Sequence, residues 1–241
     1  MAALDARAED RLAEFAGGVR AALGERLLCL AVYGSAAGPD WVAGRSDVNT
    51  AVVVGRVTLD VLEALAPVVA ARDPVLALPL ILDTEYLQRA RDTFPMELAD
   101  LRAQHRVLAG TDVFAAVETD PAALRRECER EARGKLLRLR TVFLATAGDP
   151  VGLERVMVES LKSFLVLLRH LLALRGTAAT YDYAAVLAAG EAALGPLPGM
   201  HRVLAHRTGT PRLAPAALRA AFADYLADVE RVAGALDRLD A

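Results

Sequence analysis

The sequence predicts an α+β (mixed α/β) fold, in which a small mixed sheet with flanking helices is followed by an all-α helical bundle. Up to about residue 118, short apolar runs of strand length alternate with segments of helical spacing. Beyond residue 119, every periodic segment has helical spacing, and aspartate–proline pairs precede the longest ones. With 241 residues, 54% of them hydrophobic and 24% charged, the chain can bury two cores. We therefore expect two domains, residues 1–118 and 119–241.

The first half combines helix-like and strand-like segments. Leu12, Phe15 and Val19 recur at helical spacing, which predicts an opening helix that ends near Gly24. The apolar runs that predict strands are residues 27–33, 48–54, 75–82 and 94–101. The further helices expected in this half run from Thr58 to about Ala71 and over a short segment after Thr84.

The second half is predicted to be helical throughout. Asp120–Pro121 and Asp149–Pro150 each place a capping side chain before a proline, which suits the first turn of a helix. The predicted helices are residues 121–146, 150–175, 182–194, 199–206 and 215–239. Consecutive helices with short connections favour an antiparallel bundle.

Composition and charge argue against several classes of function. A net charge of −3 and a pI near 5.9 do not fit a broadly basic nucleic-acid or membrane surface. The basic segment 201–207 is short and has no interleaved aromatic residues, so it predicts no nucleic-acid site. Cys29 and Cys128 lack metal-ligand spacing and are expected to be reduced thiols. No signal-peptide pattern and no membrane-length apolar run is present, so we expect a cytoplasmic protein without a membrane partner.

The stretch from Gly34 to Asn49 contains the residue types of a phosphate and metal site. A strand that runs into Gly34 and Ser35 lets the backbone approach an anion closely, because glycine has no side chain. A short helix beginning at Ser35 or Ala36 would add free N–H groups. Asp47 and Asn49 are two residues apart on a strand, so their side chains point to the same face. Two oxygen ligands beside a phosphate cradle are what a Mg²⁺–nucleotide site requires.

A third acidic ligand is expected on a neighbouring strand. The predicted strand 94–101 offers Glu97 and Asp100, which are three residues apart and would face opposite sides. Glu97 would lie in the middle of this strand, where an unpaired carboxylate is costly and a cation would compensate it. The alternative is that Glu97 forms an ion pair with Arg102 or Arg106.

These residues resemble the motif of the DNA-polymerase-β-type nucleotidyltransferase superfamily. The family pattern is Gly-Ser, a variable loop, an Asp-x-Asp or Asp-x-Glu pair and a distant third carboxylate. The matching positions are Gly34-Ser35, Asp47-Val48-Asn49 and Glu97. The run Met-Glu-Leu-Ala-Asp-Leu at 96–101 is similar to the third-acid strand of minimal members. The resemblance covers roughly residues 27–110 and concerns bacterial aminoglycoside-type and minimal nucleotidyltransferases, in which a helical bundle follows the catalytic domain.

The resemblance implies an enzyme that moves a nucleoside monophosphate from a nucleoside triphosphate to an acceptor hydroxyl and releases pyrophosphate. It implies Mg²⁺ or Mn²⁺ held by Asp47, Asn49 and Glu97, with Asp47 and Glu97 as catalytic residues. The further positions expected to bind the phosphates are Gly34, Ser35, Arg45 and Lys162. The acceptor would be a small molecule or a protein side chain, and a homodimer is one of the oligomeric states left open.

Asn49 departs from the family pattern, which has an acid at that position. An amide oxygen can coordinate Mg²⁺, but it does not neutralise a second divalent ion. The alternative to an enzyme is therefore a catalytically degraded nucleotide-binding or regulatory module, of the kind found in toxin–antitoxin-like arrangements. A purely structural α/β and helical protein is a third alternative.

Several polar and aromatic residues also have ordinary structural interpretations. Gly34–Ser35 can be a simple turn at the end of a strand, and Trp41 can anchor its loop rather than stack on a base. On the helix 150–175, Lys162, Arg169 and His170 can belong to a solvated face with ion pairs. The functional alternative is that Lys162 or Arg169 contacts a triphosphate and that His170 lies near the acceptor.

Overall fold

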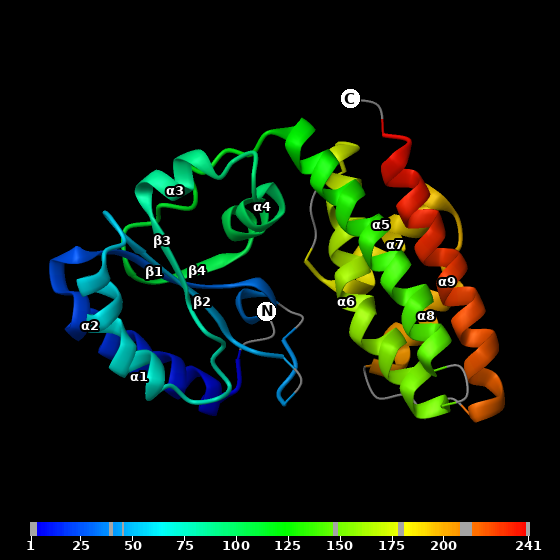
Figure 1. The fold of residues 1–241 in the computed structure, drawn as a ribbon, viewed down its shortest axis with the longest axis horizontal. Helices are drawn as coiled ribbons and strands as arrows, with labels where there is room; N and C mark the ends of the chain where they lie inside the picture. Colours follow the sequence, from blue (N-terminus) through cyan, green and yellow to red (C-terminus); the bar gives the residue numbers. More distant parts are fainter. Residues whose placement is uncertain are drawn as a thin grey trace. The chain divides into compact units, whose positions relative to one another are not determined.

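The computed structural model describes residues 4–38, 41–44, 46–146, 149–177, 181–207 and 214–239. Its contacts divide the chain into two compact units, Met1–Ala123 and Leu124–Ala241 (Figure 1). The first unit contains the sheet, and the second is made of helices. The fold class predicted from the sequence, a small mixed sheet with flanking helices followed by helices alone, is confirmed.

The first unit contains four strands. These are β1 (Leu27–Tyr33), β2 (Asn49–Val54), β3 (Leu80–Asp83) and β4 (His105–Gly110). Its helical segments are α1 (Ala6–Leu23), η1 (Gly24–Arg26), η2 (Gly34–Ala37), α2 (Leu59–Ala70), α3 (Thr84–Arg89) and α4 (Pro95–Ala103). The strand order is β3-β2-β1-β4, with β2 and β3 parallel and the other pairs antiparallel. This mixed pairing places the end of β1 directly beside the start of β2, where Tyr33 pairs with Asn49.

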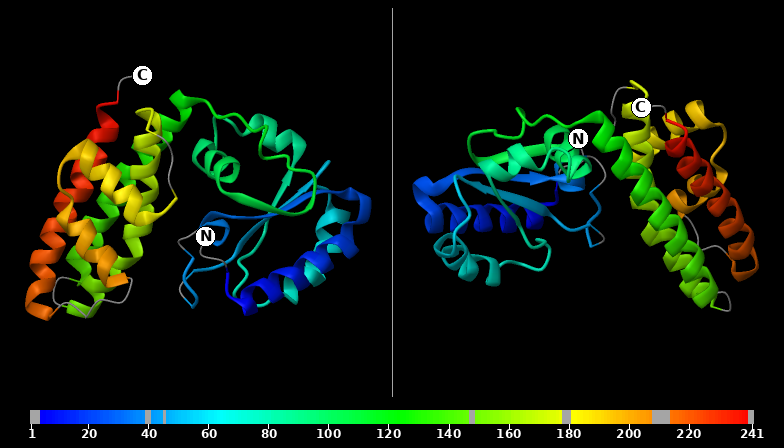
Figure 2. Two further views of the ribbon diagram at one scale, coloured as in Figure 1. Left: turned by 180° about the vertical axis from the view of Figure 1, so that it is seen from behind. Right: turned by 45° about the horizontal axis from the view of Figure 1, so that its top comes forward.

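Alternation along the strands divides the core between the two faces of the sheet. Val32, Val48 and Val52 pack against α1 and α2, and we call this side the α1–α2 face. Ala31 and Val53 lie in the second cluster, and we call this side the α3–α4 face. The residues that cover the α3–α4 face include Leu87 of α3, Leu98 and Leu101 of α4, and Phe114. The views in Figure 2 agree that α1 and α2 lie on one side of the sheet and α3 and α4 on the other.

The first two predicted strands are confirmed, and the other two differ from the structure. Residues 27–33 form β1, and 49–54 form β2 after an isolated bridge between Val48 and Leu76. Only the end of the predicted strand 75–82 enters a regular strand, β3.

The prediction of a strand over 94–101 is wrong, because these residues form most of α4. Pro95 stands in the first turn of this helix, where its missing N–H costs nothing. Leu98 and Leu101, three residues apart, are both buried against the sheet, which is a helical spacing. The fourth strand of the sheet is instead β4, which begins two residues after α4 ends and was not predicted.

The helices of the remaining chain are confirmed to within two residues at each end. They are α5 (Pro121–Thr146), α6 (Pro150–Leu174), α7 (Tyr183–Leu194), α8 (Pro198–Arg207) and α9 (Pro215–Asp237). The Asp149 side chain accepts a hydrogen bond from the Val151 N–H at 3.0 Å, as expected of a capping residue before a proline. Helix α6 packs against α7, α8 and α9, and its buried face includes Leu161, Phe164 and Leu168. Among the helices described, none combines the length and the apolar character that crossing a bilayer requires.

Candidate functional site

The candidate site begins where β1 ends. Gly34 has φ +71°, a backbone conformation that favours glycine, and its N–H donates to the Gln104 carbonyl at 3.2 Å. A Cβ atom at this position would lie 3.7 Å from the Asn49 amide nitrogen, Nδ2. The turn therefore brings the backbone of Gly34 against Asn49, the first residue of β2.

Ser35 has a buried hydroxyl group that nothing in the described chain satisfies. The residue is 9% exposed, and its Oγ has no hydrogen-bond partner among the residues that the structure describes. Ser35 lies in η2, a 3-10 turn of four residues rather than an α-helix, so the predicted contribution of a helix dipole is small. A buried hydroxyl without a partner is uncommon, and an anion bound at this turn would provide one.

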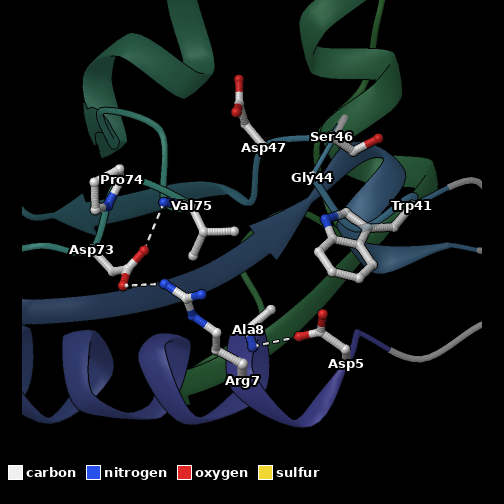
Figure 3. A pocket seen from close by; sticks show the side chains of 10 residues that line it. All are labelled: Asp5, Arg7, Ala8, Trp41, Gly44, Ser46, Asp47, Asp73, Pro74 and Val75. Carbon is white, nitrogen blue, oxygen red and sulfur yellow. Dashed lines mark hydrogen bonds and ion pairs between the residues drawn. The ribbon is translucent and has the colours of Figure 1, made fainter.

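The prediction that Asp47 and Asn49 share one face of the sheet stays a prediction, because Asp47 lies two residues before β2. The residue between them, Val48, is buried on the α1–α2 face, and its N–H donates to the Val75 carbonyl at 2.9 Å. Alternation on either side of Val48 favours the α3–α4 face for both side chains. Figure 3 shows the Asp47 carboxyl group directed away from Arg7, which belongs to α1.

Glu97 reaches this face from a helix rather than from a strand. It lies in the first turn of α4, the helix that packs on the α3–α4 face. Burial, and then the negative charge of Glu97, raise the pKa of Tyr33. The same two causes raise the pKa of Tyr86 on α3. Because Tyr33 pairs with Asn49 in the sheet, the carboxylate of Glu97 lies within electrostatic reach of the start of β2.

The structure does not support an ion pair as the role of Glu97. Arg106 donates instead to the Glu9 carboxylate at 2.8 Å. Within the part of the chain described, Glu97 has no hydrogen bond or salt bridge, with Arg102 or with any other cation. Its side chain is exposed, so water can hydrate this charge.

The donor set does not fit a site for two divalent ions. Among the described residues, no three His, Cys, Asp or Glu side chains gather where they could hold a metal. The register of β2 and β3 pairs Ala51 with Leu80, so the segment 76–79 (Leu-Ala-Leu-Pro) runs beside the start of β2. That segment has no carboxylate, and the acid that follows, Asp83, caps α3 by accepting from the Tyr86 N–H at 2.7 Å. The available oxygen donors are the carboxylate of Asp47, two residues before β2, and the amide of Asn49, the first residue of β2. Glu97 on α4 adds a second carboxylate.

Two predicted phosphate-binding residues are not placed at this site. Arg45 lies outside the described residues. Lys162 lies on α6 of the second unit with an exposed side chain, and its contact with a triphosphate stays a prediction. On the same helix, Arg169 and His170 are 6% and 4% exposed, so the interpretation of a solvated face is wrong for both. The Arg169 guanidinium lies 4.3 Å above the ring centre of Tyr181.

Tyr33 and His105 lie beside the candidate site but were not among the predicted site residues. Tyr33 lies between Asn49 and His105 in the sheet, so the three residues form a row across β2, β1 and β4. The His105 ring Nε2 lies 3.0 Å from the Asp112 carboxylate. Burial opposes the shift, but hydrogen bonds from the Ala115 N–H and from His105 hold the pKa of Asp112 below its ordinary value. Tyr33 could have been found from its place directly before Gly34, whereas His105 required the unpredicted strand β4.

The comparisons with known proteins show a fold and no closer relationship. No protein-family model and no curated protein sequence matches the chain. A crystal structure of spectinomycin adenyltransferase AAD(9) from Enterococcus faecialis, with ATP and spectinomycin, has a TM-score of 0.55 and 15% sequence identity to this chain. The match covers 95% of this chain and 99% of the other. At this identity the likeness concerns the fold alone: the chain has a nucleotidyltransferase-like fold.

Proposed function

We propose that this protein binds a nucleoside triphosphate where β1 ends and β2 begins, as a nucleotide-binding module whose metal site is reduced. The observation that supports this most directly is the Ser35 hydroxyl, which is buried and without a partner among the described residues. It lies directly after Gly34, whose missing side chain leaves the backbone open to an anion. The nucleotidyltransferase-like fold agrees with a nucleotide as ligand, since the similar adenyltransferase was crystallised with ATP.

In this proposal the turn at Gly34 and Ser35 holds the phosphates. The Ser35 Oγ–H donates to a phosphate oxygen, and the backbone at Gly34, which carries no side chain, accommodates the rest of the group. The Tyr33 phenol, whose pKa burial raises above the ordinary value of 10.0, is neutral at pH 7 and adds no negative charge to the site. Asp47 and Asn49 supply one carboxylate and one amide oxygen, which suits a nucleotide that arrives with a single Mg²⁺ or Mn²⁺ already bound.

The same residues argue against rapid transfer through two metal ions. Asn49 replaces the acid of the family pattern, and the neighbouring segment 76–79 supplies no carboxylate in its place. Two divalent ions close together need more negative ligand charge than Asp47 and an amide provide. We therefore infer binding, and a regulatory use of binding, as the primary function.

Nucleotidyl transfer to an acceptor hydroxyl is the second candidate, and Glu97 is the observation that favours it. Its carboxylate is exposed, has no ion pair among the described residues and acts on Tyr33, beside Asn49. As a general base it would take the proton of an acceptor hydroxyl while the oxygen attacks the α-phosphorus and pyrophosphate leaves. The acceptor would be a small hydroxylated molecule or a protein side chain.

The binding proposal is tested by removing one buried hydroxyl at a time. Calorimetry with ATP, GTP, CTP and UTP in the presence of Mg²⁺ should show binding that Ser35→Ala weakens about tenfold, the loss expected for one charged hydrogen bond. Thr50→Val is the matched control, because Thr50 Oγ1 is also buried without a partner among the described residues. Its neighbours Val48 and Val52 place it on the α1–α2 face, so this variant should bind as the wild type does. Equal effects of both variants would contradict the proposed phosphate site.

An assay of pyrophosphate release distinguishes the two candidate functions. We expect no turnover by the wild type with any of the four nucleotides, and a measurable rate from Asn49→Asp because it restores a second carboxylate. Release of pyrophosphate by the wild type, abolished by Asp47→Ala and Glu97→Gln, would instead establish the transferase. If the wild type bound none of the four nucleotides, both candidate functions would be ruled out.

A further inference from the structure

A cavity of about 440 Å³ lies behind the loop that carries Asp47, on the side of α1 (Figure 3). Its walls come from the start of α1, from Trp41, Gly44, Ser46 and Asp47, and from the segment Asp73, Pro74 and Val75. This volume falls in the range of pockets that hold small molecules in proteins. Asp47 contributes to the wall, with its carboxyl group directed away from Arg7, so the cavity adjoins the proposed nucleotide site.

Trp41 places a hydrogen-bond donor without a partner at this cavity. The residue is 8% exposed, and its Nε1 has no hydrogen-bond partner among the described residues. Figure 3 shows the indole nitrogen on the side of the ring that faces Val75 and Arg7. A buried N–H group without a partner is rare, because it loses its bond to water and gains nothing. A ligand can supply the hydrogen-bond acceptor that the described residues do not provide for Trp41 Nε1.

The cavity also has carboxylates in its lining. The Asp5 Oδ1 accepts from the Ala8 N–H at 2.7 Å, and within the described chain its Oδ2 has no hydrogen bond. The Asp73 Oδ1 accepts from the Val75 N–H at 2.9 Å, and its Oδ2 lies 3.6 Å from the guanidinium of Arg7. Arg7 is 78% exposed in its side chain, and its contact with Asp73 is a long one. The polar groups at the cavity therefore include one donor without a partner among the described residues, the Asp5 carboxylate with an unused oxygen and the Asp47 carboxylate. The ion pair of Arg7 with Asp73 adds to them.

We propose that this cavity binds a small amino-substituted heterocycle. A ring nitrogen or carbonyl of the ligand accepts from the Trp41 Nε1–H, and its amino group donates to the Asp5 carboxylate. The apolar ring lies against Ala8, Pro74 and Val75, which line the same cavity. The inference does not depend on the proposed nucleotide site, because its two polar contacts come from Trp41 and Asp5, which that proposal does not use.

The test uses the one tryptophan of the chain as its own reporter. Because Trp41 is the single tryptophan, an isotope-labelled sample gives one indole N–H signal in a nitrogen–proton correlation spectrum. Titration with 2-aminopyrimidine should shift this signal in a saturable way, since the N–H gains an acceptor. Pyrimidine, which lacks the amine, and aniline, which lacks the ring acceptor, should each bind at least about tenfold more weakly.

Two variants tie the signal to the proposed contacts. Asp5→Asn should weaken the binding of 2-aminopyrimidine at least about tenfold. The variant preserves the cap of α1, because asparagine is also a good N-cap residue. Asp182→Asn, the same change at the N-cap of α7, should leave fragment binding unchanged, since Asp182 does not line the cavity. No saturable shift with 2-aminopyrimidine would overturn the proposal, as would equal shifts from all three fragments, no effect of Asp5→Asn, or an equal effect of Asp182→Asn.

Discussion

Single residues at the end of β1 determine how the chain can approach an anion. Gly34 lies at φ +71° directly before the buried Ser35, so one residue supplies the turn and the next supplies the hydroxyl. A side chain at position 34 would meet both an unfavourable backbone conformation and the amide of Asn49. The glycine is therefore required by the geometry of the turn.

Replacing Gly34 should cost stability, and a second glycine provides the control. Gly34→Ala should lower the free energy of unfolding by about 1–2 kcal/mol, the cost of a left-handed conformation for a residue with a Cβ atom. Gly17 lies within α1, has no positive φ and leaves open space where a methyl group would stand, so Gly17→Ala should stabilise by about 0.5–1 kcal/mol. Urea denaturation of both variants measures the two effects. Equal changes of the same sign would contradict the assigned turn.

Asp228 is a buried carboxyl group that caps a neighbouring helix. It is 1% exposed and accepts from the Met200 N–H of α8 at 2.9 Å. Burial raises its pKa above the ordinary value of 3.8, although the hydrogen bonds from Met200 and Gly199 act in the opposite direction. The folded protein therefore holds the proton of this group more tightly than the unfolded chain does.

This shift predicts a pH dependence with a definite sign. A carboxyl group with a raised folded pKa contributes most stability below the ordinary value of 3.8 and loses it as the pH rises through the folded value. Asparagine at this position accepts the same N–H and does not ionise. The free energy of unfolding of the wild type minus that of Asp228→Asn should therefore fall with rising pH across this window and then become constant. Denaturant unfolding of both proteins at several pH values measures the difference, and a rise with pH would contradict the assignment.

At the scale of elements, α4 determines which acid reaches the candidate site. The helix begins at Pro95 and buries Leu98 and Leu101 on the α3–α4 face. Glu97, between the proline and the first buried leucine, is thereby held beside the end of β1. In a strand, the Glu97 side chain would point to the face opposite that of its two neighbours. In α4, its direction is set by its position in the helical turn.

The placement of α4 predicts a coupling between Glu97 and two tyrosines. Glu97→Gln removes a negative charge, so the raised pKa values of Tyr33 and Tyr86 should move down toward 10.0. Ultraviolet titration of the phenolates, with Tyr33→Phe to identify the signal, measures the change. Glu85→Gln on α3 is the control, because Glu85 is not among the causes of either shift. If Glu85→Gln had the larger effect, α4 would be misplaced.

At the scale of the whole molecule, the chain consists of two compact units, and the proposed nucleotide site belongs to the first. Its residues come from η2, from the segment around the start of β2 and from α4, all within Met1–Ala123. A ligand that binds only the folded state stabilises the unit that holds it. The helical unit contributes Lys162 only as a prediction.

Nucleotide binding should therefore be visible as a local gain of stability. At a nucleotide concentration of about 100 times Kd, the first unit should gain about 2.7 kcal/mol. Hydrogen exchange should slow in β1 and β2, whereas the exchange of α7 should stay unchanged. Asp47→Ala should reduce the protection. Protection confined to the helical unit would place the ligand elsewhere.

The sequence by itself determined the helices α5 to α9 and the strands β1 and β2. These features depend on local periodicity, on capping residues such as Asp149 and on the alternation of side chains in a strand. Only the tertiary structure decided the role of residues 94–101 and of β4, because a short apolar run fits a strand and a buried helix equally well. The pairing of β2 with β3, which sets the carboxylate-free segment 76–79 beside Asn49, is a contact between segments distant in sequence. Strand pairing of this kind is chosen by the packing of the whole core, which no local pattern contains.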